Sequence, residues 1–285
     1  MHNKTTDTIK ISFIGGGNMA GALIGGLYDS YASNPATAVF KPADMHVVDV
    51  NAESLQRLTD KFGVITSQQI DEQLQQADVI VLAVKPQQMR EVAEQLAPHI
   101  NDQLIISIAA GIRFNDLSRW LNNYQTIVRT MPNMPALINK GITGIYAAPN
   151  VTDEQRSIAN QVMNAVGATV WLDNEALLDP LTAVSGSGPA YVFYFIEAMQ
   201  AAAQEMGFTS QQGRQLAMAT FMGAAQLAND STESVATLRE RVTSKGGTTH
   251  AALLSMEQSG VGEAIVKALK AAALRSQELG DEYGR

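Results

Sequence analysis

The stretch from Ile9 to Leu27 limits the possible folds of this chain more than any other. It opens with IKISFI, whose four apolar residues predict a short buried strand. Gly15-Gly16-Gly17 then interrupts the strand pattern. Apolar residues return at helical spacing, at Met19, Ala20, Leu23, Ile24 and Leu27. Strand, glycine turn and helix therefore follow one another directly, as at the start of a βα unit.

Within this turn, Gly15, Gly17 and Ala20 form a G-x-G-x-x-A pattern. Gly15 would permit a tight turn, Gly17 would let a pyrophosphate approach the backbone, and Ala20 would let the helix pack closely on the strand. The free N–H groups and the dipole of the helix start would hold the phosphates of a dinucleotide. The alternative is a glycine-rich turn in an ordinary βα unit.

The second predicted strand, Met45–Val48, ends at Asp49. In dinucleotide-binding folds an acidic residue at this place accepts hydrogen bonds from the adenosine ribose and repels a 2′-phosphate. The separation from the glycines exceeds the usual ~20 residues, and we attribute the excess to a polar loop over Tyr31–Ala43. The alternative is that Asp49 caps a helix starting near Ala52, since Asp is a preferred N-cap residue.

Two further segments point to the same edge of a sheet. Ala77–Val84 is a continuous apolar run, typical of a parallel strand covered on both faces, and it stops at Lys85-Pro86, which suits a new helix. Leu104–Ile108 predicts another buried strand, ending in the small residues Ala109-Ala110-Gly111. Because ligands bind at the carboxyl ends of parallel strands, we expect Ala83–Pro86 on the nicotinamide side of a cofactor.

The remaining pattern completes an α/β domain over residues 1–173. Strands and helices alternate, so we predict a Rossmann-type doubly wound parallel sheet. Asn133 stands between two prolines in a stiff turn with a polar tip. The additional strands are expected at Gly63–Thr66, Thr126–Thr130, Gly144–Ala148 and Ala168–Leu172, and helices at Ala52–Phe62 and Thr152–Ala165.

Residues 174–285 show no convincing strand and predict an all-α second domain. A helix beginning near Pro189 is apolar on more than one face, at Tyr191, Phe195 and Met199 among others, so it must be buried. We expect a partner subunit to cover it; the alternative is a central helix within one monomer. The preceding Ser185–Pro189 is either a linker with a cap or a rigid turn near the cofactor.

The segment VTSKGGTTHAALLSME, at Val242–Glu257, carries a second candidate anion site. Gly246-Gly247 end one helix, and Thr248 or Thr249 is expected to cap the next. Hydroxyls and backbone N–H groups at a helix start can converge on one anion, which here would be a substrate carboxylate. The alternative is an ordinary helix–helix turn.

Composition excludes several classes of function. The chain has 285 residues, 28 acidic and 20 basic side chains, and a formal charge of −8, so neither nucleic acid nor an anionic membrane surface is expected as a partner. With no cysteine there is no disulfide, thiolate metal site or thiol nucleophile, and we expect no bound metal. The N-terminal MHNKTTDT lacks the apolar core of a signal peptide, and a cytoplasmic protein is expected.

Four stretches in this order resemble the pyrroline-5-carboxylate reductase family: IGGGNMAGALIGGL, AVKP, SGSGPAY and VTSKGGTTHAALLSME. RTMPNMPAL is also similar to the family pattern. The resemblance implies reduction of the cyclic imine 1-pyrroline-5-carboxylate to L-proline by NADPH or NADH, the final step of proline biosynthesis. It also implies dimers built through the helical domain, often assembled further into decamers.

The resemblance also implies roles for individual residues. Thr249 would approach the ring nitrogen, and Ser244, Gly247 and Thr248 would join it in binding the substrate. Asp49 departs from the small hydroxylated residues common in NADPH-preferring members. The cofactor-binding positions implied are Gly15, Gly17, Asn18, Met19, Asp49, Ala83, Val84, Lys85, Pro86, Ala109, Ala110 and Gly111.

Two rival interpretations remain. A 3-hydroxyacid dehydrogenase would need a catalytic lysine on the long helix, and Ala190–Ala203 has none. A non-catalytic dinucleotide-binding regulator would have no need of the loop from Ser244 to Thr249. We assign no side chain as an obligatory general acid, since His250 follows Thr249 one step inside the helix and is expected to be a filler.

Overall fold

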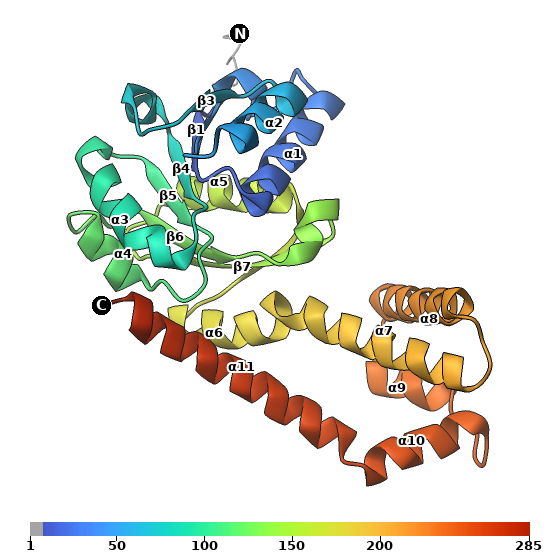
Figure 1. Ribbon diagram of the computed structural model, residues 1–285. Coiled ribbons are helices and arrows are strands. Elements are labelled where there is room, and N and C mark those ends of the chain that lie inside the picture. Colours follow the sequence, from blue (N-terminus) through green and yellow to red (C-terminus); the bar gives the residue numbers. More distant parts are fainter. Residues whose placement is uncertain (1–7) are drawn as a thin grey trace. The chain divides into compact units, whose positions relative to one another are not determined.

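The computed structural model describes residues 8–285, so the N-terminal stretch in which no signal peptide is expected lies almost wholly outside the described residues. By its internal contacts the chain forms two units, and Figure 1 labels most of their helices and strands. The sheet unit comprises Met1–Gly186 and Ala272–Arg285, and the helical unit comprises Ser187–Ala271. The functional boundary predicted between residues 173 and 174 stays a prediction.

The sheet unit is built on one eight-stranded sheet in the order β3-β2-β1-β4-β5-β6-β7-β8. The first six strands are parallel, as predicted, and the order reverses direction at β1, which gives the doubly wound topology. The strands are β1 (Ile11–Ile14), β2 (Met45–Val48), β3 (Ile65–Ser67), β4 (Val79–Leu82), β5 (Leu104–Ser107), β6 (Ile127–Met131), β7 (Gly141–Ala147) and β8 (Gly167–Trp171).

The last two strands extend the sheet as predicted, but their direction was not predicted. β7 pairs antiparallel with β6 and β8 pairs parallel with β7, so both run opposite to the first six strands. The short turn through η4 (Met134–Ile138) connects β6 directly to its neighbour β7. A connection this short cannot make the long crossover that a parallel neighbour requires.

Helices cover both faces of the sheet, because successive strand residues point to opposite sides. In β4, Val79 and Val81 enter one hydrophobic core, and Ile80 and Leu82 enter the other. The first core is closed by α1, α2 and α5, and the second by α3 and α4. The helices of the sheet unit are α1 (Asn18–Ser33), α2 (Ala52–Phe62), α3 (Pro86–Leu96), α4 (Phe114–Trp120), α5 (Asp153–Asn164) and α6 (Leu178–Leu181).

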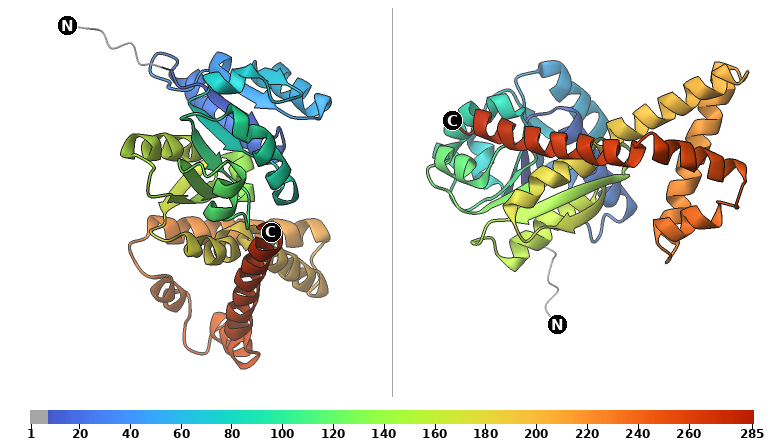
Figure 2. Two further views of the ribbon diagram at one scale, coloured as in Figure 1. Left: turned by 90° about the vertical axis from the view of Figure 1, so that its left-hand side faces the viewer. Right: turned by 90° about the horizontal axis from the view of Figure 1, so that it is seen from below.

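The helical unit contains no strand, as predicted, and has almost no core of its own. Its elements are α7 (Gly188–Glu205), α8 (Ser210–Asp230), α9 (Val235–Arg241), α10 (Thr248–Gln258) and the first part of α11 (Val261–Tyr283). Between residues 187 and 271 only Ala203, Gly213 and Ala217 are buried, where α7 and α8 pack closely. α11 is one continuous helix, drawn in red in Figure 2, and its last turns belong to the sheet unit.

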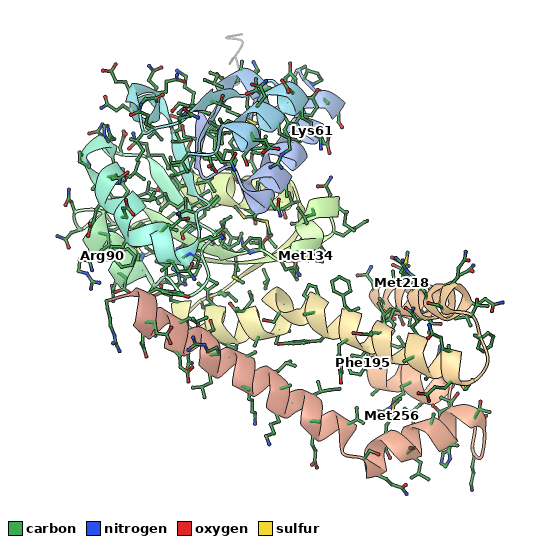
Figure 3. All side chains as sticks on the ribbon, in the orientation of Figure 1. Lys61, Arg90, Met134, Phe195, Met218 and Met256 are labelled. Atoms are coloured by element: carbon green, nitrogen blue, oxygen red, sulfur yellow. The ribbon has the colours of Figure 1, made fainter. Side chains whose placement is uncertain are left out.

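Most of the apolar residues of α7 are exposed in the single chain. Phe193 is 55% and Tyr194 is 71% exposed. Figure 3 labels Phe195, Met218 and Met256 on three different helices of the helical unit, and Met256 is also more than half exposed. The alternative of a central helix buried within one monomer is therefore wrong. Exposed apolar surface on this scale indicates a protein interface.

Among the residues that the structure describes, no helix combines the length and the apolar character needed to cross a bilayer.

His46 lies on β2 with 4% of its surface exposed, and its Nδ1 is 3.3 Å from Ser12 Oγ on the neighbouring strand β1. Burial lowers the pKa of His46 below its ordinary 6.5, and nearby Asp71 only partly opposes that shift. The unfolded chain therefore binds a proton near pH 6.5 that the folded chain does not yet bind. We expect the free energy of unfolding to fall as the pH drops below about 6.5, and His46→Gln to flatten that decrease in urea titrations.

Candidate active site

The glycine turn and the two small-residue segments predicted from sequence lie side by side at the carboxyl edge of the sheet. The N–H of Gly15 donates to Val48 O at 2.8 Å, and the N–H of Ala83 donates to Ile14 O at 2.8 Å. The N–H of Ile108, just before Ala109, donates to Leu82 O at 3.2 Å. These bonds continue the parallel pairing past the strand ends and place the three segments in one row.

Gly15 is required by both its conformation and its neighbour. Its φ of +104° lies in the region that side chains rarely adopt, and a Cβ on it would stand 2.7 Å from Ala83 O. The turn therefore packs directly on the backbone of Ala83, and an alanine at position 15 would push the two segments apart.

Gly17 is a glycine for a different reason. It is the N-cap residue of α1, no side chain caps the helix, and the first turn has no acidic residue. A Cβ on Gly17 would meet no heavy atom within 4 Å, so packing does not demand a glycine here. An open helix start with space beside it fits a pyrophosphate. Ala20, the third member of the pattern, is 1% exposed and packs in the core.

Asp49 faces the glycine turn. Its Oδ2 accepts a hydrogen bond from the N–H of Gly16 at 2.5 Å, and its Oδ1 accepts from the N–H of Asn51 at 2.8 Å. The alternative that Asp49 caps α2 is wrong, because Asn51 is the N-cap residue and its Oδ1 accepts from Glu53 and Ser54 N–H. The carboxylate of Asp49 thus stands beside the glycine turn, at the place where dinucleotide-binding folds hold an adenosine ribose.

Of the two segments on the other side of β1, Ala83–Pro86 is partly exposed, whereas Ala109 and Gly111 are buried. Pro86 is the first residue of α3, as predicted, and its N-cap residue Lys85 makes no capping bond through its side chain. After β5, Gly111 has a φ of +77°, which allows the sharp turn that ends the Ala109-Ala110-Gly111 segment.

Asn133 is a residue whose role sequence reasoning left open. It is 8% exposed, and its side-chain Oδ1 accepts from the N–H of Ile142 at 3.0 Å. Its Nδ2 donates to Ser185 O at 3.1 Å. The oxygen and the nitrogen of the Asn133 side chain therefore both bond to backbone groups. These two bonds link β7 to the π-helical turn Thr182–Gly186, which precedes α7. Sequence alone could not show this contact, because it joins segments 52 residues apart.

Asn133→Asp tests this tie. The carboxylate keeps the acceptor for Ile142 but places an oxygen against Ser185 O, so a buried acceptor loses its donor. We expect the free energy of unfolding to fall by about 1–3 kcal/mol in urea titrations. Asn160→Asp is the matched control, because Asn160 uses only its oxygen, toward Thr169 and Trp171. A loss of equal size in both variants would contradict the assigned role.

The loop at Ser244–Thr249 belongs to the helical unit. α10 begins at Thr248 with Gly247 as N-cap residue and no capping side chain, so the prediction that Thr248 or Thr249 caps this helix is wrong. Gly246 takes the positive φ of +75°, and a Cβ on Gly247 would collide with Ser244 Oγ. Because neither threonine caps the helix, their hydroxyls and the first N–H groups of α10 stay available to an anion.

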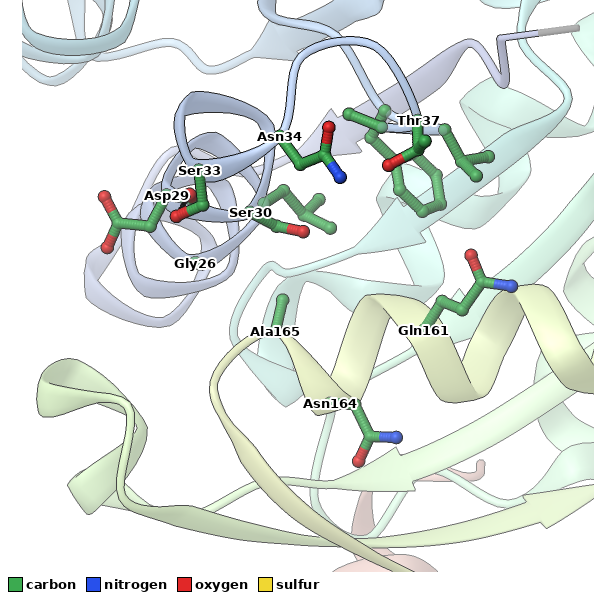
Figure 4. Close-up of a pocket in the computed structure, with 13 residues that line it drawn as sticks. Gly26, Asp29, Ser30, Ser33, Asn34, Thr37, Gln161, Asn164 and Ala165 are labelled. Atoms are coloured by element: carbon green, nitrogen blue, oxygen red, sulfur yellow. Dashed lines mark hydrogen bonds between the residues drawn. The ribbon is translucent and has the colours of Figure 1, made fainter. Parts of the chain in front are cut away.

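One cavity lies away from these segments. It measures about 550 Å³ and lies between the C-terminal end of α1 and α5, with Asn34, Gln161 and Asn164 among its lining residues (Figure 4). The glycine turn is at the opposite, N-terminal end of α1. Within residues 8–285, no group of three or more His, Asp or Glu side chains is arranged to hold a metal ion.

The sheet topology, the tight turn at Gly15, the open start of α1 and the carboxylate of Asp49 are typical of a dinucleotide-binding protein. Residues 10–111 match a family described as NADP oxidoreductase, coenzyme F420-dependent, and residues 175–279 match pyrroline-5-carboxylate reductase dimerisation. The chain is 43% identical to the pyrroline-5-carboxylate reductase of Pseudomonas aeruginosa over 98% of its own length and 99% of that protein. It belongs to the pyrroline-5-carboxylate reductase family.

Other relatives agree along the whole chain. The pyrroline-5-carboxylate reductase of Haemophilus influenzae is 40% identical over 94% of this chain and 97% of that protein. The solved structure of the Coxiella burnetii enzyme, 38% identical, superposes with a TM-score of 0.87 over 96% of this chain and 99% of that one. A Plasmodium falciparum pyrroline carboxylate reductase solved with NADP bound is 27% identical, with a TM-score of 0.83 over 96% and 99% of the two chains.

Proposed function

We propose that this protein reduces 1-pyrroline-5-carboxylate to L-proline with NADPH or NADH, the last step of proline biosynthesis. One observation carries the proposal. In this member of the family, the N-termini of α1 and α10 both lack a capping side chain, and we call each of them an anion cradle because its free N–H groups can bind an anion. The first is the Gly15–Met19 turn at the start of α1. The second is the Ser244–Thr249 loop at the start of α10.

We assign a different anionic group to each cradle. The dinucleotide pyrophosphate binds at the N–H groups of Gly17, Asn18 and Met19, and the nicotinamide lies toward Ala83–Pro86 and Ala109–Gly111. The substrate carboxylate binds the second cradle, through Ser244, Gly247 and Thr248.

Thr249 then orients the ring nitrogen of the cyclic imine. The imine accepts hydride readily once its nitrogen is protonated, and a substrate that arrives protonated needs no general acid from the protein. Positioning of the two reactants supplies most of the acceleration. His250, beside Thr249, is exposed and is given no part in the reaction.

A steady-state assay with pyrroline-5-carboxylate tests the proposal. NADH and NADPH are supplied in parallel, and the product is identified by mass spectrometry. Proline formation that depends on both the imine and a reduced cofactor is the expected result. If a folded preparation binds the dinucleotide yet forms no proline with either cofactor, the protein is a non-catalytic dinucleotide-binding protein instead.

We expect Asp49 to favour NADH. Its carboxylate beside Gly16 is placed to bond the ribose hydroxyls and to repel a 2′-phosphate. Asp49→Ser should shift the ratio of kcat/KM values toward NADPH by about tenfold, or ~1.4 kcal/mol. The control is Asn51→Ser, which replaces one good cap of α2 by another and should leave the cofactor ratio unchanged. An unchanged ratio in Asp49→Ser would remove Asp49 from cofactor discrimination.

The family match over residues 175–279 and the exposed apolar surface of α7 support self-association as a dimer. Assembly of such dimers into a decamer is part of the proposal, and light scattering of the purified protein measures it. A cytoplasmic location is proposed as well, in keeping with a chain that has no cysteine.

A further inference from the structure

The end of α11 contacts α3, which directly follows one of the segments that we place on the nicotinamide side of the cofactor, and it contacts the turn that ends the other segment. Tyr283 is half-buried, and its hydroxyl accepts a hydrogen bond from Gln87 Nε2 at 2.8 Å. Gln87 is the second residue of α3 and follows Pro86 directly. Arg90, one turn further along α3, donates to the backbone carbonyl of Arg285 at 3.0 Å.

The same helix end also packs on the turn after β5. A Cβ on Gly280 would lie 3.0 Å from Gly111 O, so the helix and the turn touch backbone to backbone. Two residues after Gly111, Arg113 forms a 2.7 Å ion pair with Asp281 and donates to Gln277 O at 3.1 Å. Gly280 is buried, and this contact leaves no room for a side chain at position 280.

The helix end is itself held firmly in the sheet unit. Ser276 is 5% exposed and donates to Asp179 Oδ1 at 2.6 Å. Arg119 on α4 donates to the carbonyl of Gly284. The last turns of α11 therefore act as a fixed brace that contacts α3 on one side and the turn at Gly111 on the other.

We propose that residues 276–285 are a positioning element that sets the two nicotinamide-side segments relative to each other. The proposal rests on the function proposed above, because that function places the nicotinamide at Ala83–Pro86 and Ala109–Gly111. None of the brace residues is assigned contact with the cofactor. They act through the backbone of the segments they hold.

The proposal predicts that displacing the brace impairs the binding of only one half of the cofactor. The adenosine half of the cofactor depends on the turn at Gly15 and on Asp49, which the end of α11 does not contact. Displacing the brace should weaken the interactions of the nicotinamide half and leave the adenosine half unchanged. A general loss of structure would weaken both halves alike.

Gly280→Ala is the variant that tests this. The added methyl would lie 3.0 Å from Gly111 O and from Arg113 Nε and Nη2, so these neighbours must give by a few tenths of an ångström, whereas alanine is intrinsically the better helix residue. We expect NADH to bind about tenfold more weakly to this variant than to wild type. ADP, which carries only the adenosine half, should bind with a dissociation constant within about twofold of wild type, and the Tm should be unchanged. Calorimetry supplies the dissociation constant of each ligand. Gly262→Ala is the matched control on the same helix, because a Cβ there meets nothing within 4 Å.

A second variant and a second readout keep the test decisive. Tyr283→Phe removes only the hydroxyl that Gln87 binds and should weaken NADH without affecting ADP, to a smaller degree than Gly280→Ala. With 4-deuterated NADH, both variants should show a larger primary isotope effect on kcat, since a misplaced nicotinamide slows hydride transfer.

Three results overturn the inference: unchanged NADH affinity in Gly280→Ala, equal weakening of NADH and ADP, or wild-type protein that binds no dinucleotide. The last result also overturns the proposed function. Wild-type protein that binds NADH but forms no proline overturns the proposed function alone, and the binding comparison then still decides on the brace.

Discussion

Gly15→Ala should lower dinucleotide affinity by about 100-fold, or about 2.7 kcal/mol, and should also destabilise the folded protein by about 1–3 kcal/mol. Two effects combine at this position. Alanine is strained at a φ of +104°, and its Cβ would collide with the carbonyl of Ala83. The turn can accept the methyl only by moving away from the neighbouring segment, which would displace the N–H groups that we propose to hold the pyrophosphate. Calorimetry and urea unfolding measure the two losses separately.

Gly17→Ala is the matched control, because Gly17 has a negative φ of −70° and open space where the methyl would go. We expect its stability to stay within about 0.5 kcal/mol of wild type while dinucleotide affinity falls, since only the bound cofactor needs that space. If Gly17→Ala instead binds the dinucleotide normally, the pyrophosphate does not lie over the start of α1.

Thr249→Ala should lower kcat/KM for the imine by roughly 10- to 100-fold, corresponding to about 1.4–3 kcal/mol of transition-state interaction. Thr249 lies in the first turn of α10, whose N-cap residue is Gly247, so its hydroxyl is free to meet the ring nitrogen. Cofactor affinity should change little, because we propose that the turn at Gly15–Met19 binds the phosphates. Initial rates at varied imine and saturating cofactor provide the measurement.

Thr249→Ser distinguishes a chemical role from a packing role. Serine keeps the hydroxyl and loses only a methyl, so it should recover most of the activity that alanine loses. Near-normal kcat/KM in a folded Thr249→Ala variant would remove Thr249 from the mechanism.

The sheet could be predicted well because its strands are clear apolar runs with well-marked ends. β4 is apolar throughout and fully buried, and β2 and α2 have the limits expected from MHVV and from Ala52–Phe62. The direction of β7 was beyond prediction, since an alternating pattern is the same whichever way a strand runs. The short connection after β6 sets the direction of β7, and the geometry of that connection depends on tertiary pairing.

The predictions for helix caps failed where several good capping residues stand together. Asp49 and Asn51 are both preferred N-cap types, and only the backbone decides that Asn51 caps α2 while Asp49 turns to Gly16. At α10, a glycine took the cap position ahead of two threonines. The ties made by Asn133 and Gly280 were equally invisible, because each joins residues far apart in the sequence.

The discontinuous sheet unit has a consequence for how the chain is made. Its first 186 residues leave the ribosome before the helical unit, whereas Ala272–Arg285 emerge only after it. Until then Gln87, Arg113 and Arg119 lack their partners on α11, and the backbone of Gly111 has no cover. We therefore expect these contacts to form only after residues 272–285 have been made, and a chain that stops before them should bind the adenosine half of a cofactor better than the nicotinamide half.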